Sequence, residues 1–170
     1  MVATGTGKSG PKNLTTFERK SDLELLITRS FDGPARIVFD AWTRPELLRR
    51  WWAPCSLGVS LIECDADVRV GGTYRYVFGR AGEKSMAFSG MYREVTPHSR
   101  LVYTSIFEPM RAAGEAIVTA TLSEHAGKTR LELHSLYPSK AALDGAVGAG
   151  MEHGARETMD QLETLVASLR

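Results

Sequence analysis

The sequence predicts an α+β fold in which a curved antiparallel β-sheet wraps around a long C-terminal α-helix. Three observations indicate this. The last stretch, residues 151–170, repeats apolar residues at the spacing of one helix face. About six strand-like segments, joined by short turns, precede it. Two short helical segments stand between the first strand and the second. Consecutive hairpins make an antiparallel sheet, and helices grouped on one of its faces define the α+β class.

The first strand is predicted at residues 23–31, where apolar and polar residues alternate. Pro34 then suits the first position of a helix, because proline lacks the amide hydrogen that this position leaves unpaired. Residues 43–46, Thr-Arg-Pro-Glu, have the form of a capping box. They predict a second short helix over residues 45–52, and Pro54 ends that helix.

The next strand, residues 57–68, moves its apolar residues from one face to the other halfway along. The change falls at Leu61 and Ile62, which indicates a β-bulge there, and a bulge bends a sheet. Glycine- and proline-containing turns separate the later segments. These later strands are predicted at residues 73–78, 86–95, 101–107, 117–123 and 129–136.

The C-terminal helical region begins at Ser139, a residue type favoured as an N-cap. Glycines at positions 145, 148 and 150 predict a break before the main helix. The apolar seam of that helix consists of Met151, Ala155, Thr158, Met159, Leu162, Leu165, Val166 and Leu169. A helix of about 20 residues is roughly 30 Å long and is not stable alone, so the sheet must cover its seam. A long helix on a curved sheet leaves a space between them, where we expect the functional site.

Composition predicts one domain with a short leader. Residues 1–20 are rich in Gly, Thr, Ser and Lys and hold few apolar anchors, so we predict a disordered leader and a single domain over residues 21–170. Cys55 and Cys64 would lie about 30 Å apart in an extended strand, too far for a disulfide, which fits a reducing compartment. Without a signal-peptide pattern or a run of about 18 apolar residues, we predict a cytoplasmic protein with no membrane span.

Charge and motifs disfavour several function classes. The 21 basic and 20 acidic residues nearly cancel, so nothing favours nucleic acid as a partner. The four histidines stand at no metal-site spacing, and the sequence has neither a nucleophile elbow nor a dinucleotide fingerprint. We therefore predict no metal and no cofactor. His153, beside the apolar seam, is the one histidine near the expected space.

Several strings in this order resemble one known family. They are residues 39–43, 45–48, 51–52, 67–72, 89–90, 100–104, 129–131 and 150–154. Over residues 22–168 the chain resembles the START-like (SRPBCC) helix-grip superfamily, and within it the branch named after the C-terminal domain of the heat-shock-protein-90 ATPase activator. The resemblance implies the helix-grip fold, in a superfamily that includes lipid carriers, hormone-binding proteins and aromatic-ring cyclases. Members usually carry tryptophan where this chain has Ala155, so the space there is either refilled by neighbours or larger.

Aromatic and methionine residues form the candidate ligand-binding site. They are Trp51, Trp52, Tyr74, Tyr76, Phe88, Tyr92, Tyr103, Met151, Ala155 and Met159. Together they would make an adaptable apolar wall whose phenol hydroxyls can orient a ligand; the alternative is an ordinary hydrophobic core. Because adjacent residues on a helix face apart, we expect one of Trp51 and Trp52 to pack inward and the other to be partly exposed.

Arg75 lies between two of these candidates in the sequence, and two orientations are open for its side chain. Arg75 alternates with Tyr74 and Tyr76, so it points to solvent if the tyrosines face inward. In the reversed register Arg75 would lie inside and need a partner such as Glu94. A neighbouring acidic face, expected to be solvated, consists of Glu63, Asp65 and Asp67.

The sequence thus predicts a binding protein for a small hydrophobic or amphipathic ligand, held between the sheet and the C-terminal helix. Two other functions stay open. One is a cofactor-independent, cyclase-like enzyme acting on an aromatic or polyketide-like substrate, with tyrosines and Glu94 or Arg75 as acid–base groups. The other, implied by the resemblance, is an interaction module that activates a chaperone ATPase. Both a monomer and a homodimer are compatible with the sequence.

Overall fold

The computed structural model describes residues 13–170, so residues 1–12 of the predicted leader lie outside the described residues. The strands are β1 (Thr16–Arg19), β2 (Glu24–Phe31), β3 (Ser60–Ala66), β4 (Thr73–Gly79), β5 (Met86–Thr96), β6 (Arg100–Phe107), β7 (Ala116–His125) and β8 (Lys128–Leu136). The helices are α1 (Ala35–Thr43), α2 (Pro45–Leu48), α3 (Lys140–Gly148) and α4 (Met151–Leu169), with two 3-10 turns, η1 (Cys55–Leu57) and η2 (Glu108–Ala113).

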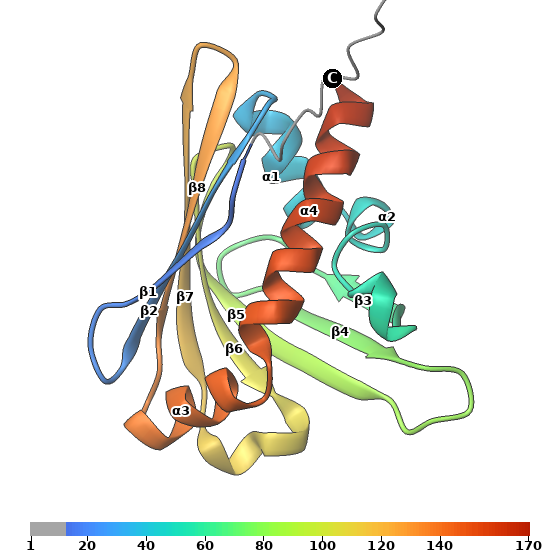
Figure 1. The fold of residues 1–170 in the computed structure, drawn as a ribbon, viewed down its shortest axis with the longest axis vertical. Coiled ribbons are helices and arrows are strands. Elements are labelled where there is room, and N and C mark those ends of the chain that lie inside the picture. The colour runs from blue at the N-terminus through green and yellow to red at the C-terminus, as the bar shows by residue number, and fades with distance from the viewer. Residues whose placement is uncertain (1–12) are drawn as a thin grey trace, which may run out of the picture.

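The strands form one antiparallel sheet in the order β1-β2-β8-β7-β6-β5-β4-β3. The helices α1 and α4 pack on the same face of this sheet, which we call the inner face (Figure 1). The short helices α1 and α2 stand between β2 and β3, and α4 runs across the sheet. The predicted α+β helix-grip fold is confirmed.

The edge strand β1 was not predicted. Residues Thr16 to Arg19 pair in antiparallel register with Thr28 to Leu25 of β2. The side chain of Thr15, just before the strand, is only 4% exposed. The predicted domain boundary at residue 21 is therefore wrong for this segment. The composition of β1 is polar, with Phe17 as its main apolar anchor, so its side chains did not predict a strand. Its order comes from backbone hydrogen bonding to β2.

The predicted bulge at Leu61 and Ile62 is confirmed. The register of β3 on β4 shifts between Leu61 and Glu63. A second shift lies in β5, between Tyr92 and Glu94, where it pairs with β6. Each bulge bends its strand and increases the local twist, so the two shifts help to curve this half of the sheet.

The two short helices differ in detail from the prediction. The first helix begins at Ala35 with Pro34 as its N-cap, one residue later than expected. The second covers only Pro45–Leu48, and its N-cap is Arg44 without a side-chain hydrogen bond. The predicted capping box is wrong because Thr43 still belongs to α1, where its hydroxyl donates to the Phe39 carbonyl at 2.8 Å.

The break before the C-terminal helix is confirmed. The Ser139 hydroxyl caps α3 by accepting from the Ala142 amide at 3.1 Å. Gly150 then takes a left-handed conformation, with φ at 84°, between α3 and α4. The apolar seam of α4 is buried at four positions, which are Met159, Leu162, Leu165 and Val166.

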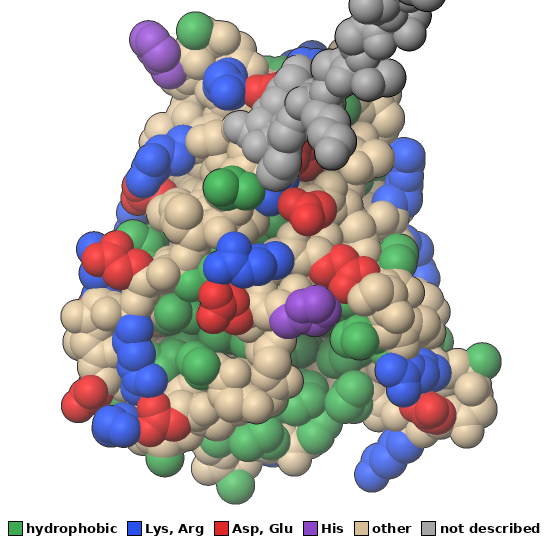
Figure 2. Space-filling model, in the orientation of Figure 1, with side chains coloured by type: hydrophobic (Ala, Val, Ile, Leu, Met, Phe, Trp, Pro, Cys, Tyr) green, Lys and Arg blue, Asp and Glu red, His purple; other side chains and the backbone are tan. Residues whose placement is uncertain are grey.

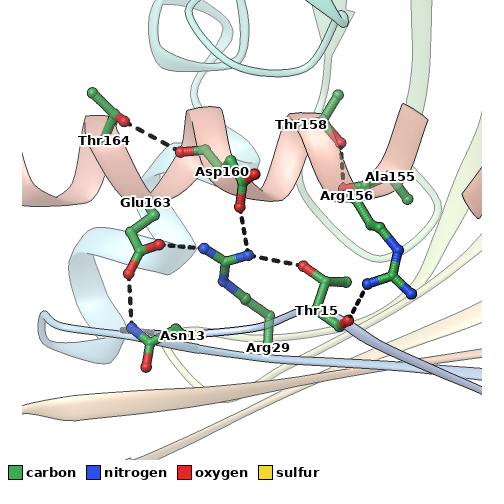
Figure 3. Close-up of polar contacts among 9 residues, drawn as sticks. All are labelled: Asn13, Thr15, Arg29, Ala155, Arg156, Thr158, Asp160, Glu163 and Thr164. Atoms are coloured by element: carbon green, nitrogen blue, oxygen red, sulfur yellow. Dashed lines mark hydrogen bonds and ion pairs between the residues drawn. The ribbon is translucent and has the colours of Figure 1, made fainter. Parts of the chain in front are cut away.

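A polar network fixes α4 over the β1–β2 half of the sheet (Figure 3). Arg29 lies on the inner face of β2 and is 3% exposed. Its guanidinium donates to Thr15 Oγ1 at 2.9 Å and to Asp160 Oδ1 at 2.7 Å, and also to Glu163. The amide of Asn13 donates to the same Glu163 carboxylate at 2.7 Å. Because this anchor joins α4 to β1 and β2, the half of the sheet formed by β4, β5 and β6 depends on other elements for its cover.

Candidate functional site

A cavity of about 150 Å³ lies on the inner face of β4, β5 and β6. Its walls are almost wholly aromatic. It is lined by Trp42, Trp52, Tyr74, Tyr76, Phe88, Tyr92, Tyr103 and Ser105. On the face of the molecule in Figure 2, hydrophobic side chains gather in the lower part, between the N-terminal half of α4 and β4. This apolar region borders β4, the strand that carries Tyr74 and Tyr76 of the cavity wall (Figure 2).

Tyr74 and Tyr76 reach the cavity because side chains alternate along β4. The Tyr74 ring lies across β5 and its hydroxyl donates to the Thr104 carbonyl of β6 at 2.6 Å. Gly90 of β5 makes this possible. A Cβ atom at Gly90 would lie 2.8 Å from Tyr74 Cε1 and 1.9 Å from the Thr104 carbonyl oxygen, distances that are sterically forbidden. The floor of the cavity thus requires glycine at this position.

The tryptophan pair behaves as predicted, with one ring inside and one partly exposed. Trp51 is 2% exposed, and its indole N–H donates to the Ala41 carbonyl at 2.8 Å. Trp52 is partly exposed and covers the cavity. Its ring centroid lies 5.4 Å from that of Tyr76 and 5.7 Å from that of Phe88. Trp52 is thus the aromatic wall that faces both the cavity and the surface.

The segment that carries Trp52 is held by two polar side chains of α4. The Gln161 amide donates to the carbonyls of Trp51 and Ala53, at 2.8 Å each, and its oxygen accepts from the Cys55 amide at 2.9 Å. The Glu157 carboxylate accepts from the backbone and side chain of the adjacent residue 56. These hydrogen bonds lower the pKa of Glu157. Helix α4 therefore serves the cavity by positioning the Trp52 segment.

Six of the predicted site residues come together at the cavity, and four do not line it. The six are Trp52, Tyr74, Tyr76, Phe88, Tyr92 and Tyr103; the four are Trp51, Met151, Ala155 and Met159. The cavity was predicted between the sheet and the C-terminal helix; it lies instead on the inner face of β4, β5 and β6, and none of its described lining residues belongs to α4. Helix α4 docks on α1 and β2, so its apolar seam fills the core beside the cavity instead of forming its wall.

Two cavity residues were missing from the predicted site. Ser105 stands two positions after Tyr103 on β6, so strand alternation could have placed it on the same face. Trp42, in α1, was not among the predicted site residues. Its ring centroid lies 4.8 Å from that of Trp51, and Trp42 itself lines the cavity, whereas Trp51 does not.

Burial keeps the phenols of the cavity neutral. It raises the pKa of Tyr74, Tyr76, Tyr92 and Tyr103 above the ordinary value of 10. For Tyr76, the nearby Tyr92 raises the pKa further. Neutral phenols donate and accept hydrogen bonds, so these hydroxyls can orient a polar group but do not act as bases near neutral pH.

We expect these tyrosines to make stability fall at alkaline pH. Their folded pKa values lie above the unfolded value of 10, so the stability they contribute is complete below pH 10 and is lost as the pH rises further. Urea unfolding of the protein and of a Tyr103→Phe variant, at pH 7, 9 and 11, measures this. The variant should lose less free energy of unfolding than the parent between pH 9 and 11. Parallel loss in both would contradict the assignment.

The charged residues near the candidates lie on the outer face of the sheet. Arg75 donates to both carboxylate oxygens of Glu108, at 3.0 and 2.9 Å, and these bonds lower the pKa of Glu108 to about 2. Glu94 instead accepts from Arg100 at 3.0 Å. The outward orientation of Arg75 is confirmed, and the reversed register with Glu94 as its partner is wrong. The acidic residues Glu63, Asp65 and Asp67 are also exposed, as predicted for a solvated face. His153, on α4, is exposed as well.

Two features that residues 13–170 lack bear on the class of site. In this part of the chain, no three His, Cys, Asp or Glu side chains are grouped so that they could hold a metal ion. No helix in the same range combines the length and apolar character that crossing a bilayer requires. Cys55 is exposed and Cys64 is buried, and both are free thiols.

Comparison with known proteins gives one family and several similar folds. The model of the family described as "Activator of Hsp90 ATPase homolog 1-like protein" matches residues 32–167. No curated protein matches the chain. A crystal structure of a Rhodobacter sphaeroides protein is 23% identical, with a TM-score of 0.83 over 91% of this chain and 99% of that chain.

Two further structures share the fold. A crystal structure of a Chromobacterium violaceum protein is 27% identical, with a TM-score of 0.69 over 84% of this chain and 96% of that chain. CalU16 from Micromonospora echinospora is 22% identical, with a TM-score of 0.59 over 92% of this chain and 87% of that chain. These similarities agree with the antiparallel sheet and long terminal helix described above.

Proposed function

The chain belongs to the family of activator of Hsp90 ATPase homolog 1-like proteins, and from this premise we propose that it binds a small hydrophobic or amphipathic molecule in the aromatic cavity. The observation that carries the proposal is the cavity itself, which is about 150 Å³, partly open, and lined by seven aromatic rings and one serine. Cores are normally packed without voids of this size. Small-molecule sites have this character, an apolar wall with a few hydroxyls that fix orientation.

The cavity wall offers favourable contacts to an apolar guest. Each aromatic pair in a suitable geometry is worth about 0.5–1.5 kcal/mol beyond the burial of its area. The rings of Phe78, Phe88 and Phe107 extend the aromatic surface beyond Trp52. The centroid of Phe88 lies 5.8 Å from that of Phe78 and 4.9 Å from that of Phe107. An amphipathic ligand could therefore place its apolar part in the cavity and keep its polar end near the surface.

Thermal unfolding with a panel of apolar and amphipathic compounds tests this proposal. A compound that binds the folded state, present at about 100 times its Kd, should raise the Tm by roughly 5–10 °C. A Trp52→Ala variant should weaken binding of the same compound at least about tenfold, because it removes the ring that covers the cavity. The matched control is Met91→Ala, which alters a 45% exposed side chain of β5 and should leave binding unchanged. If no compound raised the Tm, the proposal would be wrong.

The observations favour binding over the two other predicted functions. An enzyme would have to use the neutral tyrosines or Ser105, since Arg75 and Glu94 lie outside the cavity. A role at a chaperone rests on the description of the family alone, and an ATPase assay with purified Hsp90 would test it. The two free thiols are in keeping with a reducing compartment such as the cytoplasm.

A further inference from the structure

We infer that the cavity takes an uncharged molecule with one aromatic ring and one hydrogen-bonding substituent, of the size of a simple phenol. The inference rests on the proposed function and names the class of ligand at the same site. Four properties of the cavity carry it, namely its volume, the arrangement of its aromatic rings, the absence of charge among its described lining residues, and the position of Ser105.

The volume limits the ligand to one ring. Drug-sized ligands occupy pockets of about 300–1,000 Å³, whereas an apolar cavity of about 150 Å³ holds a molecule the size of benzene. The cavity here is about 150 Å³. A fused polycyclic compound or a long acyl chain would have to leave most of its length outside the cavity or displace the Trp52 segment. That segment is held to α4 by the hydrogen bonds of Gln161 and Glu157.

The shape of the wall favours a planar guest. Tyr74 and Tyr76 have ring centroids 4.9 Å apart, and Tyr74 and Tyr103 meet edge to face at 5.7 Å. Trp52 stands edge to face over Tyr76. Rings set at these angles present both faces and edges to the cavity, and aromatic guests prefer such offset and edge-to-face contacts.

The absence of charge excludes ionic ligands. None of the described residues that line the cavity has a charged side chain at neutral pH. The low polarity of the surroundings is also seen in the tyrosines, whose pKa is raised by burial. A carboxylate ligand would lose its hydration without gaining a cationic partner, which is strongly unfavourable.

Ser105 is the hydroxyl best placed to receive the polar substituent. The Tyr74 hydroxyl already donates to the Thr104 carbonyl at 2.6 Å, and burial raises the pKa of Tyr76, Tyr92 and Tyr103, whose hydroxyls sit on large rings that form the apolar wall. A serine hydroxyl has one donor and two acceptor sites. Among the described lining residues, Ser105 is the one whose side chain is small and aliphatic, so its hydroxyl is not part of an aromatic ring. A ligand hydroxyl or amide can therefore bond to Ser105 while its ring contacts the aromatic wall.

Calorimetric titration of the full chain with matched probes tests the inference. Phenol should bind about three to ten times more tightly than toluene, which has the same number of heavy atoms but no hydroxyl. Benzamide should bind at least about a hundredfold more tightly than the isosteric benzoate. In a Ser105→Ala variant the preference for phenol over toluene should fall toward one, with toluene affinity kept. The control variant is Ser89→Ala, on the outer face of β5, which should preserve the preference.

Larger probes, 2-naphthol and 1-decanol, separate failure of the inference from failure of the proposed function. If either binds while phenol and toluene do not, the one-ring inference is overturned and the proposed function stands. Equal affinity for benzoate and benzamide, or an unchanged preference for phenol in Ser105→Ala, would also overturn the inference. If no probe binds, both fail. Signals of the tryptophan indole groups in ¹H–¹⁵N spectra locate any binding, because Trp42 and Trp52 line the cavity and Trp51 does not.

Discussion

Removing both carboxylates that face Arg29, in an Asp160→Asn, Glu163→Gln variant, is expected to lower the free energy of unfolding by about 3–5 kcal/mol. Arg29 is 3% exposed, and its Nε atom has no hydrogen-bond partner among the described residues even in the intact protein. Without the two carboxylates its charge would be left buried and uncompensated. Urea unfolding measures the loss.

The matched control for this network is an exposed ion pair on the same helix. Arg156 donates to Glu152 at 2.8 Å, and both side chains are about half exposed. A Glu152→Gln variant should cost no more than about 0.5 kcal/mol, as exposed pairs four residues apart on a helix do. Equal losses in the two variants would show that the burial of Arg29 does not set the cost. The ligand site should survive in the control and weaken in the double variant, because α4 also holds the Trp52 segment.

A Gly90→Ala variant is the second change with a large expected effect, a loss of about 3 kcal/mol or more in the free energy of unfolding. The new Cβ would lie 1.9 Å from the Thr104 carbonyl oxygen and 2.8 Å from Tyr74 Cε1. The first contact involves backbone, which cannot turn away as a flexible side chain can. Strands β5 and β6 must separate, and Tyr74 must leave the cavity wall.

Gly148→Ala is the control for this prediction. It lies at the end of α3, and a Cβ there would meet no atom within 4 Å. It should be neutral or stabilise the protein by up to about 1 kcal/mol, since alanine favours helix and restricts the unfolded chain. Thermal unfolding compares the two variants. A Gly90→Ala protein with the parent's Tm would mean that the close approach of β5 and β6 is not required.

Much of the site could be predicted because strands have a short, simple period. Tyr74 and Tyr76 alternate with Arg75, so the pattern predicted that the arginine points away from the tyrosines; the structure selects the register in which the tyrosines face inward and Arg75 pairs with Glu108. The same period on β6 puts Ser105 on the same face as Tyr103. The prediction omitted Ser105 because it selected aromatic and methionine side chains only.

The features that were not predicted correctly, β1 and the role of α4 at the cavity, depend on contacts between distant segments. The strand β1 has too few apolar residues to be read from its own sequence, and it is ordered by pairing with β2. The prediction that Met151, Ala155 and Met159 line the cavity assumed that α4 lies over the centre of the sheet. Helix α4 instead packs on α1 and β2, so the cavity is covered by Trp42 and Trp52.

The sequence by itself determined the local elements: the strands with their buried faces, the bulge at Leu61, the break at Gly150 and the seam of the last helix. Only the tertiary structure decided which half of the sheet that helix covers. The reason is that its docking depends on Arg29 meeting Asp160 and Glu163, which stand 131 and 134 positions further along the chain. The alternation of β2 places Arg29 on the inner face. The same pattern does not identify Asp160 and Glu163, the carboxylates that make burial of the arginine charge possible.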